Sequence, residues 1–208
     1  HCVISGMQGC CIYVALLKIE PGTPLDFAAA TCYIEAKPNK ERGRFMAAVT
    51  LPTHYRNVFA ELGYAQAEMD ARIENTFHTI FYGDEAHRFY HPTGPGLAYI
   101  EDTGNHDVRT EGMSYGMMLC VQTDHKAEFD ALWGWVMHYM YMQDGPNAGY
   151  FAWSCQPDGT QNANGPAPDG EEYFAMALFF AAGRWGCGSG IYDYAAMARR
   201  ILHSCLHK

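Results

Sequence analysis

The chain has 208 residues, of which 49% are hydrophobic and 14% aromatic, and this is enough for one large domain with a sizeable buried core. The formal net charge of −9 at pH 7 argues against a nucleic-acid or anionic-membrane partner, because phosphate groups are bound by Lys and Arg. No apolar run reaches the length of a membrane span, so we expect no transmembrane segment.

The first fifty residues show no sustained hydrophobic period, and we interpret 1–50 as an irregular N-terminal segment. The apolar run from Gly6 to Leu17 has the length of a signal-peptide core. It lacks a basic region before it and a prompt cleavage site after it. The sequence thus shows no intact signal peptide and leaves both a cytoplasmic and a secreted location open.

From Leu51 the hydrophobic spacing becomes helical, and we place the start of the domain there. The first two predicted helices end at Gly63 and Gly83. The stretch 84–110 is rich in Pro, Gly, His and Asp and shows no strand alternation. We predict an ordered, irregular loop there, of the kind that is often functional.

Helices resume at Thr110, which we predict to be the N-cap of a helix over 111–122. The next helix, over 126–142, has large apolar residues on more than one side and is predicted to be covered on more than one side.

A second long loop covers 143–170 and leads to a helix over 171–183 that is apolar on nearly all sides. Such a helix is expected to be fully buried. The last helix, over 192–206, is amphipathic. We predict that its inward residues are Ala198, Ile201, Leu202 and Cys205 and that Arg199 and Arg200 face outward.

These helices predict an all-α fold of helix hairpins. Buried helices alternate with amphipathic ones, which suggests two concentric layers and hence an α/α toroid. A bundle or a superhelical array fits the periodicity almost as well. A closed toroid of six hairpins needs about twelve helices, so the pattern corresponds to about half of the hairpins.

The sequence predicts neither a metal nor a cofactor. None of the eight cysteines forms a CxxC pair, and no phosphate-binding loop or GxSxG motif is present. His106 and Asp107 alone are too few for a metal site.

Glu111 is the first candidate for chemistry, in the stretch "DVRTEGMSYGMM". At the first turn of a helix the backbone dipole favours an ionised carboxylate. Burial among Met113 and Tyr115 would instead raise its pKa and make it a proton donor. The alternative is that Glu111 only complements the helix dipole. Gly112 and Gly116 share one face of this helix and allow close approach of either a ligand or a packed neighbour.

Asp169 precedes an apolar helix in the same way, so the two carboxylates could converge on one cavity, as glycoside hydrolysis requires. Tyr150 and Trp153 could stack on sugar rings or anchor their loop. The other acidic residues of this region, Asp158, Glu171 and Glu172, are also candidates. We favour helix-start charges for Glu171 and Glu172 and a turn residue for Asp158.

The stretches "TEGMSYGMM" (110–118) and "WSCQPDGT…GPAPDGEEYFAMALFFAAGRWG" (153–186) resemble glycoside hydrolase family 8. They are most similar to its branch of reducing-end xylose-releasing exo-oligoxylanases, and the similarity covers 51–208. The resemblance implies an (α/α)6 barrel and an inverting enzyme that hydrolyses β-1,4-linked xylo-oligosaccharides. It implies that Glu111 is the general acid and that Asp169 binds the sugar at the cleavage point and places the attacking water. The residues that it places along the cleft are Arg109, Tyr115, Tyr150 and Trp153.

The family's general base is an aspartate in the second half of the barrel, and no residue of this sequence matches it. We therefore interpret 51–208 as the N-terminal part of a catalytic domain and expect the chain alone to be nearly inactive. Three alternatives are a non-catalytic carbohydrate-binding remnant, an endo-acting β-1,4-glucanase or chitosanase of the same family, and a helical interaction protein. The sequence does not reveal the glycan, the exo or endo mode, or the oligomeric state.

Overall fold

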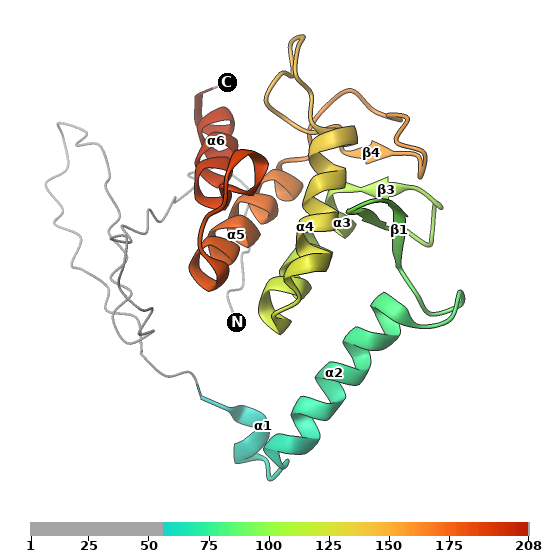
Figure 1. The fold of residues 1–208 in the computed structure, drawn as a ribbon, viewed down its shortest axis with the longest axis vertical. Helices are drawn as coiled ribbons and strands as arrows, with labels where there is room; N and C mark the ends of the chain where they lie inside the picture. The colour runs from blue at the N-terminus through green and yellow to red at the C-terminus, as the bar shows by residue number, and fades with distance from the viewer. Residues whose placement is uncertain (1–55, 208) are drawn as a thin grey trace, which may run out of the picture. The chain divides into compact units, whose positions relative to one another are not determined.

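The computed structural model describes residues 56–207 (Figure 1). The chain falls into two compact units. The first unit ends at Gly63, and its described part holds helix α1 (Val58–Glu61), which begins at Asn57. The Asn57 side chain accepts a hydrogen bond from the Ala60 N–H, as an N-cap does. The expectations for 1–50 concern residues outside the described part of the chain.

The second unit starts at Tyr64 and opens with helix α2 (Gln66–Tyr82). Only two side chains of this helix are buried, both near its end. Phe77 stacks on the ring of His125 at 3.7 Å between centroids, and Phe81 lies 5.0 Å from the ring of Tyr90. Ile73, one turn before Phe77 on this helix, is exposed. The structure therefore anchors α2 through its last two turns.

A β-hairpin occupies part of the stretch 84–110, which the sequence predicted to be wholly irregular. Strand β1 (Tyr90–Gly94) pairs antiparallel with β2 (Leu97–Ile100), with a shift in register between Pro92 and Gly94. A second, very short pair joins β3 (Val108–Arg109) to β4 (Ser154–Cys155). The expectation that the chain lacks strands is thus wrong, although the described residues are mostly helical.

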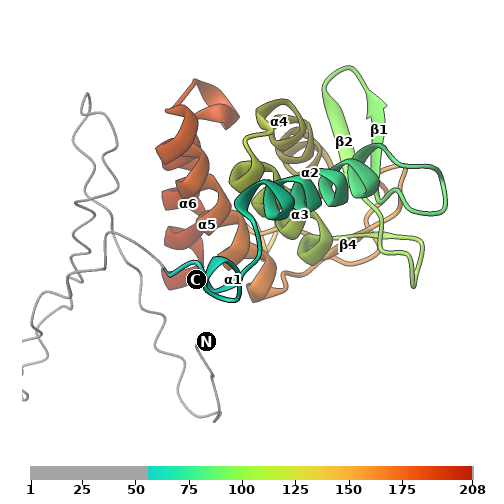
Figure 2. The ribbon, with the colours of Figure 1, turned by 90° about the horizontal axis from the view of Figure 1, so that it is seen from below.

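The helical body of this unit confirms the prediction of a helix-rich fold. Helix α5 packs against both α3 and α6, and α4 packs against α3 and β2 (Figure 2). The last turns of α4 continue as a π-helix, η2, and a 3-10 turn, η3, precedes α6. The bounds of these elements are α3 (Thr110–Thr123), α4 (Lys126–Trp135), η2 (Val136–Met140), α5 (Pro168–Trp185), η3 (Gly190–Tyr192) and α6 (Tyr194–His207). Helix α3 begins at Thr110 itself, with Arg109 as the preceding cap residue, so Thr110 is not the predicted N-cap. None of the described helices is both long enough and apolar enough to cross a lipid bilayer.

The two glycines of α3 serve close packing between elements. A Cβ atom at Gly116 would lie 2.7 Å from Cγ1 of Ile100 and 3.1 Å from Cδ1 of Leu132. At Gly112 the nearest atom would be Cγ2 of Ile100, at 3.5 Å. The structure therefore assigns these glycines to packing of α3 against β2 and α4, which is one of the two interpretations that the sequence allowed.

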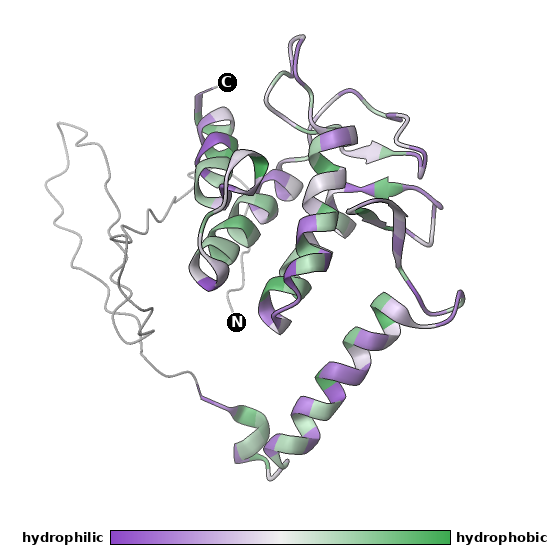
Figure 3. Ribbon diagram, in the orientation of Figure 1, coloured by the Kyte–Doolittle hydropathy of each residue, from purple (hydrophilic) through white to green (hydrophobic). Residues whose placement is uncertain are grey.

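Helix α5 is not fully buried, contrary to the prediction. It is apolar along most of its length (Figure 3). Even so, three of its large apolar side chains are 38–46% exposed: Tyr173, Met176 and Phe180. Helices α3 and α6 cover two of its sides, and no element of residues 64–207 covers the third. Tyr115 and Leu119 of α3 are also exposed. For α6 the prediction holds, because Ala198 and Ile201 are buried while Arg199 and Arg200 are exposed.

Candidate functional site

The starts of α3 and α5 are in direct contact, and this contact brings two candidate acids together. A Cβ atom at Gly170 would lie 2.5 Å from both Cβ and Oγ1 of Thr110, so only a glycine fits there. Glu111 follows Thr110 in α3, and Asp169 precedes Gly170 in α5. Both carboxylates therefore lie beside one helix-to-helix contact.

The pKa of Tyr115 also indicates that Glu111 and Asp169 lie near each other. Partial desolvation raises the pKa of the Tyr115 phenol, and the negative charges of Glu111 and Asp169 raise it further. The ring of Tyr115 lies edge-on to Tyr173 of α5, at 5.1 Å between centroids. One phenol on α3 thus lies within the electrostatic reach of both carboxylates.

Glu111 is exposed, whereas the proton-donor interpretation of the sequence invoked burial among Met113 and Tyr115. The two expected neighbours point in different directions. Met113 is fully buried in the core, and Tyr115 lies 48% exposed on the face that no element of residues 64–207 covers. Solvent therefore reaches Glu111 from that face.

Arg109 and Trp153 form a pair beside Glu111, held by the short strands β3 and β4. The guanidinium carbon of Arg109 lies 5.3 Å from the centroid of the Trp153 ring. Arg109 Nε donates to Oδ1 of Asp107 at 2.9 Å, and the Ser154 hydroxyl donates to Oδ2 of Asp107 at 2.8 Å. Asp107 is buried, and its two carboxylate oxygens orient Arg109 and Ser154. Trp153 remains 38% exposed and can offer a ring face to a ligand.

Tyr150 anchors its loop. Its hydroxyl donates a hydrogen bond of 2.8 Å to the Ser204 carbonyl oxygen on α6. The sequence left both an anchor and a sugar-stacking residue open, and the structure shows the anchoring contact. Asp158 accepts the Thr160 N–H at 2.8 Å, as the turn interpretation predicts.

Glu171 was interpreted from the sequence as a helix-start charge, and that interpretation is wrong. Its side chain is fully buried, while Glu172 is exposed. Burial raises the pKa of Glu171 to about 7, and the nearby charge of Asp169 adds to the effect. The sequence did carry a signal, because Glu171 lies three and seven residues before the buried Phe174 and Leu178 on one helix face.

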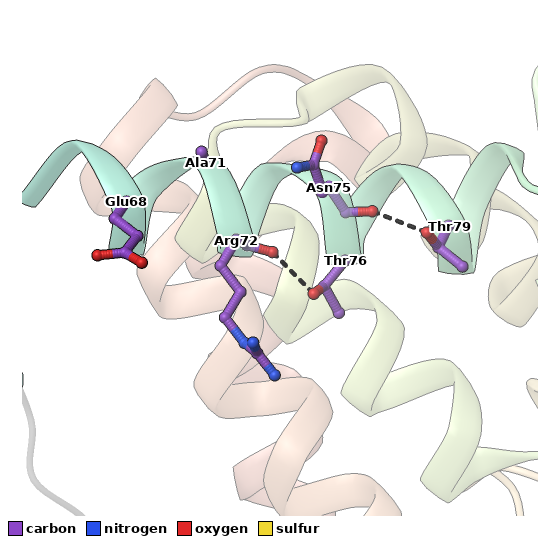
Figure 4. A pocket seen from close by; sticks show the side chains of 6 residues that line it. All are labelled: Glu68, Ala71, Arg72, Asn75, Thr76 and Thr79. Carbon is purple, nitrogen blue, oxygen red and sulfur yellow. Dashed lines mark hydrogen bonds between the residues drawn. The ribbon is translucent and has the colours of Figure 1, made fainter. Parts of the chain in front are cut away.

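His106 and the hollow along α2 do not belong to this site. Nδ1 of His106 lies 2.8 Å from Oε1 of Glu101, and the described residues contain no group of three or more His, Cys, Asp or Glu side chains arranged to hold a metal ion. A hollow runs along one side of α2 (Figure 4), where Thr76 and Thr79 donate to backbone carbonyls of their own helix. Its lining residues are Glu68, Ala71, Arg72, Asn75, Thr76 and Thr79. None of them belongs to the starts of α3 and α5.

We expect Gly170→Ala to destabilise the protein by about 1–3 kcal/mol, because the new methyl group overlaps Thr110 at the helix contact. Urea unfolding measures the change. Gly112→Ala is the matched control, since it adds the same methyl group in an early helical turn at ordinary contact distance. Equal stability of the two variants would show that α3 and α5 do not touch at Gly170.

Three comparisons place the chain among known proteins. Residues 52–205 match the family model described as glycosyl hydrolases family 8. A reducing end xylose-releasing exo-oligoxylanase from Bifidobacterium adolescentis is 59% identical over 152 residues, which are 73% of this chain and 40% of that protein. Endoglucanase 2 from Ruminiclostridium josui is 31% identical over 107 residues, half of this chain and 22% of that protein.

A solved structure agrees. Rex8A from Paenibacillus barcinonensis, complexed with xylose, superposes with a TM-score of 0.72 at 57% identity, over 74% of this chain and 41% of that one. The chain spans about 40% of the length of the exo-oligoxylanases that it matches. With a family model matched over most of its length, this chain belongs to glycosyl hydrolases family 8.

Proposed function

We propose that this chain carries the acid and the sugar-positioning carboxylate of an inverting glycoside hydrolase that acts on β-1,4-linked xylo-oligosaccharides. The supporting observation is the contact between Thr110 and Gly170, which sets Glu111 and Asp169 beside each other at the starts of two packed helices. Paired carboxylates that flank a glycosidic bond are the groups that this hydrolysis needs.

In this mechanism Glu111 protonates the oxygen that leaves the sugar. Asp169 accepts hydrogen bonds from the sugar at the cleavage point and helps to hold the attacking water. An inverting pair of acid and base stands about 6.5–9.5 Å apart, with that water between base and sugar. We assign no residue of 56–207 as the base.

The remaining contacts support a sugar-binding cleft beside the two acids. Trp153 offers an exposed ring whose position is fixed by Arg109, and Tyr115 and Tyr173 add two further rings. Flat apolar rings that end in polar groups suit the faces and hydroxyls of sugars. In this proposal Tyr150 supports the cleft from behind, through its bond to α6.

The exposed residues of α3 and α5 also support a more specific fold, the (α/α)6 toroid. We propose that α3–α4 and α5–α6 are two helix hairpins of an (α/α)6 toroid, with α3 and α5 in the inner layer. The exposed faces of α3 and α5 carry Glu111, Tyr115 and Tyr173, which suits an inner layer that lines a cleft. Residues 51–208 would then form the N-terminal part of the catalytic domain.

A xylan-type substrate is favoured over a glucan. The exo-oligoxylanases are 56–59% identical to this chain over about three quarters of its length, whereas the endoglucanases are 27–32% identical over about half. The test is calorimetry with xylotriose on this chain, combined with an assay for xylose released by a version that also carries the general base. Binding with hydrolysis supports the enzyme.

A non-catalytic sugar-binding protein is the second candidate, because the Arg109–Trp153 pair is held in place by contacts that do not involve either acid. Binding of xylotriose without any release of xylose, in a version that also carries the general base, would establish it in place of the enzyme. No binding at millimolar xylotriose contradicts both candidates and leaves an interaction protein.

We expect Trp153→Ala to weaken xylotriose binding about 5- to 10-fold, because a sugar ring loses its aromatic partner. Calorimetry gives the change in dissociation constant. Phe89→Ala is the matched control, since Phe89 is 37% exposed and Trp153 38%, but Phe89 lies outside both helix starts. Unchanged binding by Trp153→Ala would remove Trp153 from the cleft.

A further inference from the structure

Glu171 is a buried carboxyl group to which the proposed reaction gives no role. Its side chain is inaccessible to solvent. Oε1 accepts the backbone N–H of Phe151 at 3.1 Å, and Oε2 has no hydrogen-bond partner among the described residues. An acidic side chain at a helix start needs no burial to complement the dipole, and the adjacent Glu172 is exposed there.

The hydrogen bond of Glu171 joins two parts of the candidate site. Phe151, also fully buried, lies two residues before Trp153, and Glu171 lies two residues after Asp169. The backbone of Trp153 is fixed on its other sides, because its N–H donates to the Gly165 carbonyl at 3.1 Å and its carbonyl accepts the Thr110 N–H at 3.0 Å. Glu171 is thus the side chain that links the segment 150–153 to the first turn of α5.

We propose that Glu171 is a positioning residue, whose carboxyl group holds the segment 150–153 in register with Asp169. The identity of the ligand that this segment contacts, a xylo-oligosaccharide, rests on the proposed function. Without an acceptor at this place the Phe151 N–H would be a buried donor with no partner, which is costly enough to move the segment.

An acid suits this position because it can be neutral. The titratable groups that face Glu171 are Asp169 on α5, Tyr150 on the loop and Cys205 on α6. Burial raises the pKa values of Tyr150 and Cys205, so neither is negatively charged near neutral pH. A protonated Glu171 still accepts from Phe151 and adds no second negative charge beside Asp169.

The proposal makes Glu171→Gln a conservative change, because the amide oxygen can accept the Phe151 N–H in the same place. Glu171→Leu fills a similar volume without an acceptor. We expect amide hydrogen exchange at Phe151 to be about tenfold faster or more in the Leu variant and unchanged in the Gln variant. The matched control is Glu172→Gln, at the exposed neighbour, which should leave this amide unaffected.

Xylotriose binding is then measured on the same variants of the 208-residue chain. Weaker binding by Glu171→Leu, restored by Glu171→Gln, supports the positioning role. The proposal fails if Phe151 keeps its protection in Glu171→Leu, or if protection is lost while binding stays at the wild-type level. If the wild-type chain binds no xylotriose, the proposed function fails, and hydrogen exchange at Phe151 alone still decides whether Glu171 holds the segment.

A titration covers the case in which Glu171→Leu does not fold. In the wild-type chain the amide proton shift of Phe151 should change with pH as the Glu171 carboxyl ionises, and it should stay flat in Glu171→Gln. Asp169→Asn separates this effect from the charge of Asp169. A flat profile in both the wild type and Asp169→Asn would overturn the proposal.

Discussion

Glu111→Gln should lower the turnover of xylotriose by about 10²–10⁴-fold in a version of the protein that also carries the family's general base, because the leaving oxygen loses its proton donor. The amide keeps the size of the carboxyl group, so we expect the dissociation constant of xylotriose to change little. Xylose release under saturating substrate and calorimetry on the same preparation give the two quantities. A large fall in turnover with intact binding is the signature of a group that acts in the transition state.

The matched control is Glu68→Gln, which removes an exposed carboxylate from the first turn of another helix, α2. If Glu111 only complements a helix dipole, both variants should show the same small loss of stability and no specific loss of turnover. Full turnover by Glu111→Gln would show that the assignment of Glu111 as the acid is wrong.

The free energy of unfolding should fall by about 2–3 kcal/mol as the pH rises from about 4.5 to 8, on account of Glu171 alone. Burial raises the pKa of Glu171 from the ordinary 4.5 to about 7 in the folded protein. The folded state therefore binds this proton more tightly than the unfolded chain does. The stabilisation is complete below the unfolded pKa and is lost as the pH rises through the folded one.

Glu171→Gln isolates this contribution, because glutamine does not titrate. Urea unfolding of both proteins at pH 5 and pH 8 gives four free energies, and the difference between the two pH dependences removes the effect of all other groups. We expect the wild type to lose more stability than the variant on going to pH 8. Parallel pH profiles would mean that Glu171 ionises normally.

The helices were the most predictable part of the fold. The helix predicted over 111–122 runs from Thr110 to Thr123, and the one predicted over 171–183 runs from Pro168 to Trp185. Local chemistry sets these ends: Pro168 fits the first helical turn, and Gly186 follows the last residue with a φ of 77°. Such signals lie within a few residues of the boundary, so the sequence displays them directly.

The hairpin was not predictable in the same way. Strand β1 contains Pro92 and Gly94, both unusual within strands, and only its first residue is buried. Its partner β2 is held by long-range packing against α3 and α4. Because that packing determines the strand, the local sequence does not show the alternation of apolar residues that would have predicted β2.

The candidate site was likewise predictable only in part. A carboxylate at the start of each of two apolar helices is visible in the sequence, and it suggested that Glu111 and Asp169 meet. The Gly170–Thr110 contact that sets them side by side joins residues 60 positions apart and is seen only in the structure. The roles of the two acids stay predictions until turnover is measured.

The hairpin also has a practical use. Ala98 and Ile100 hold strand β2 in the core, and Ile100 packs against Gly116. Residues 92–96, at the tip of the β1–β2 hairpin, are exposed. Added Cβ atoms at Gly94 and Gly96 would meet no neighbour within 4 Å. An affinity tag or a fluorescent reporter inserted at this tip should therefore leave the acids undisturbed, which offers a way to immobilise or follow the protein while the binding of xylotriose is tested.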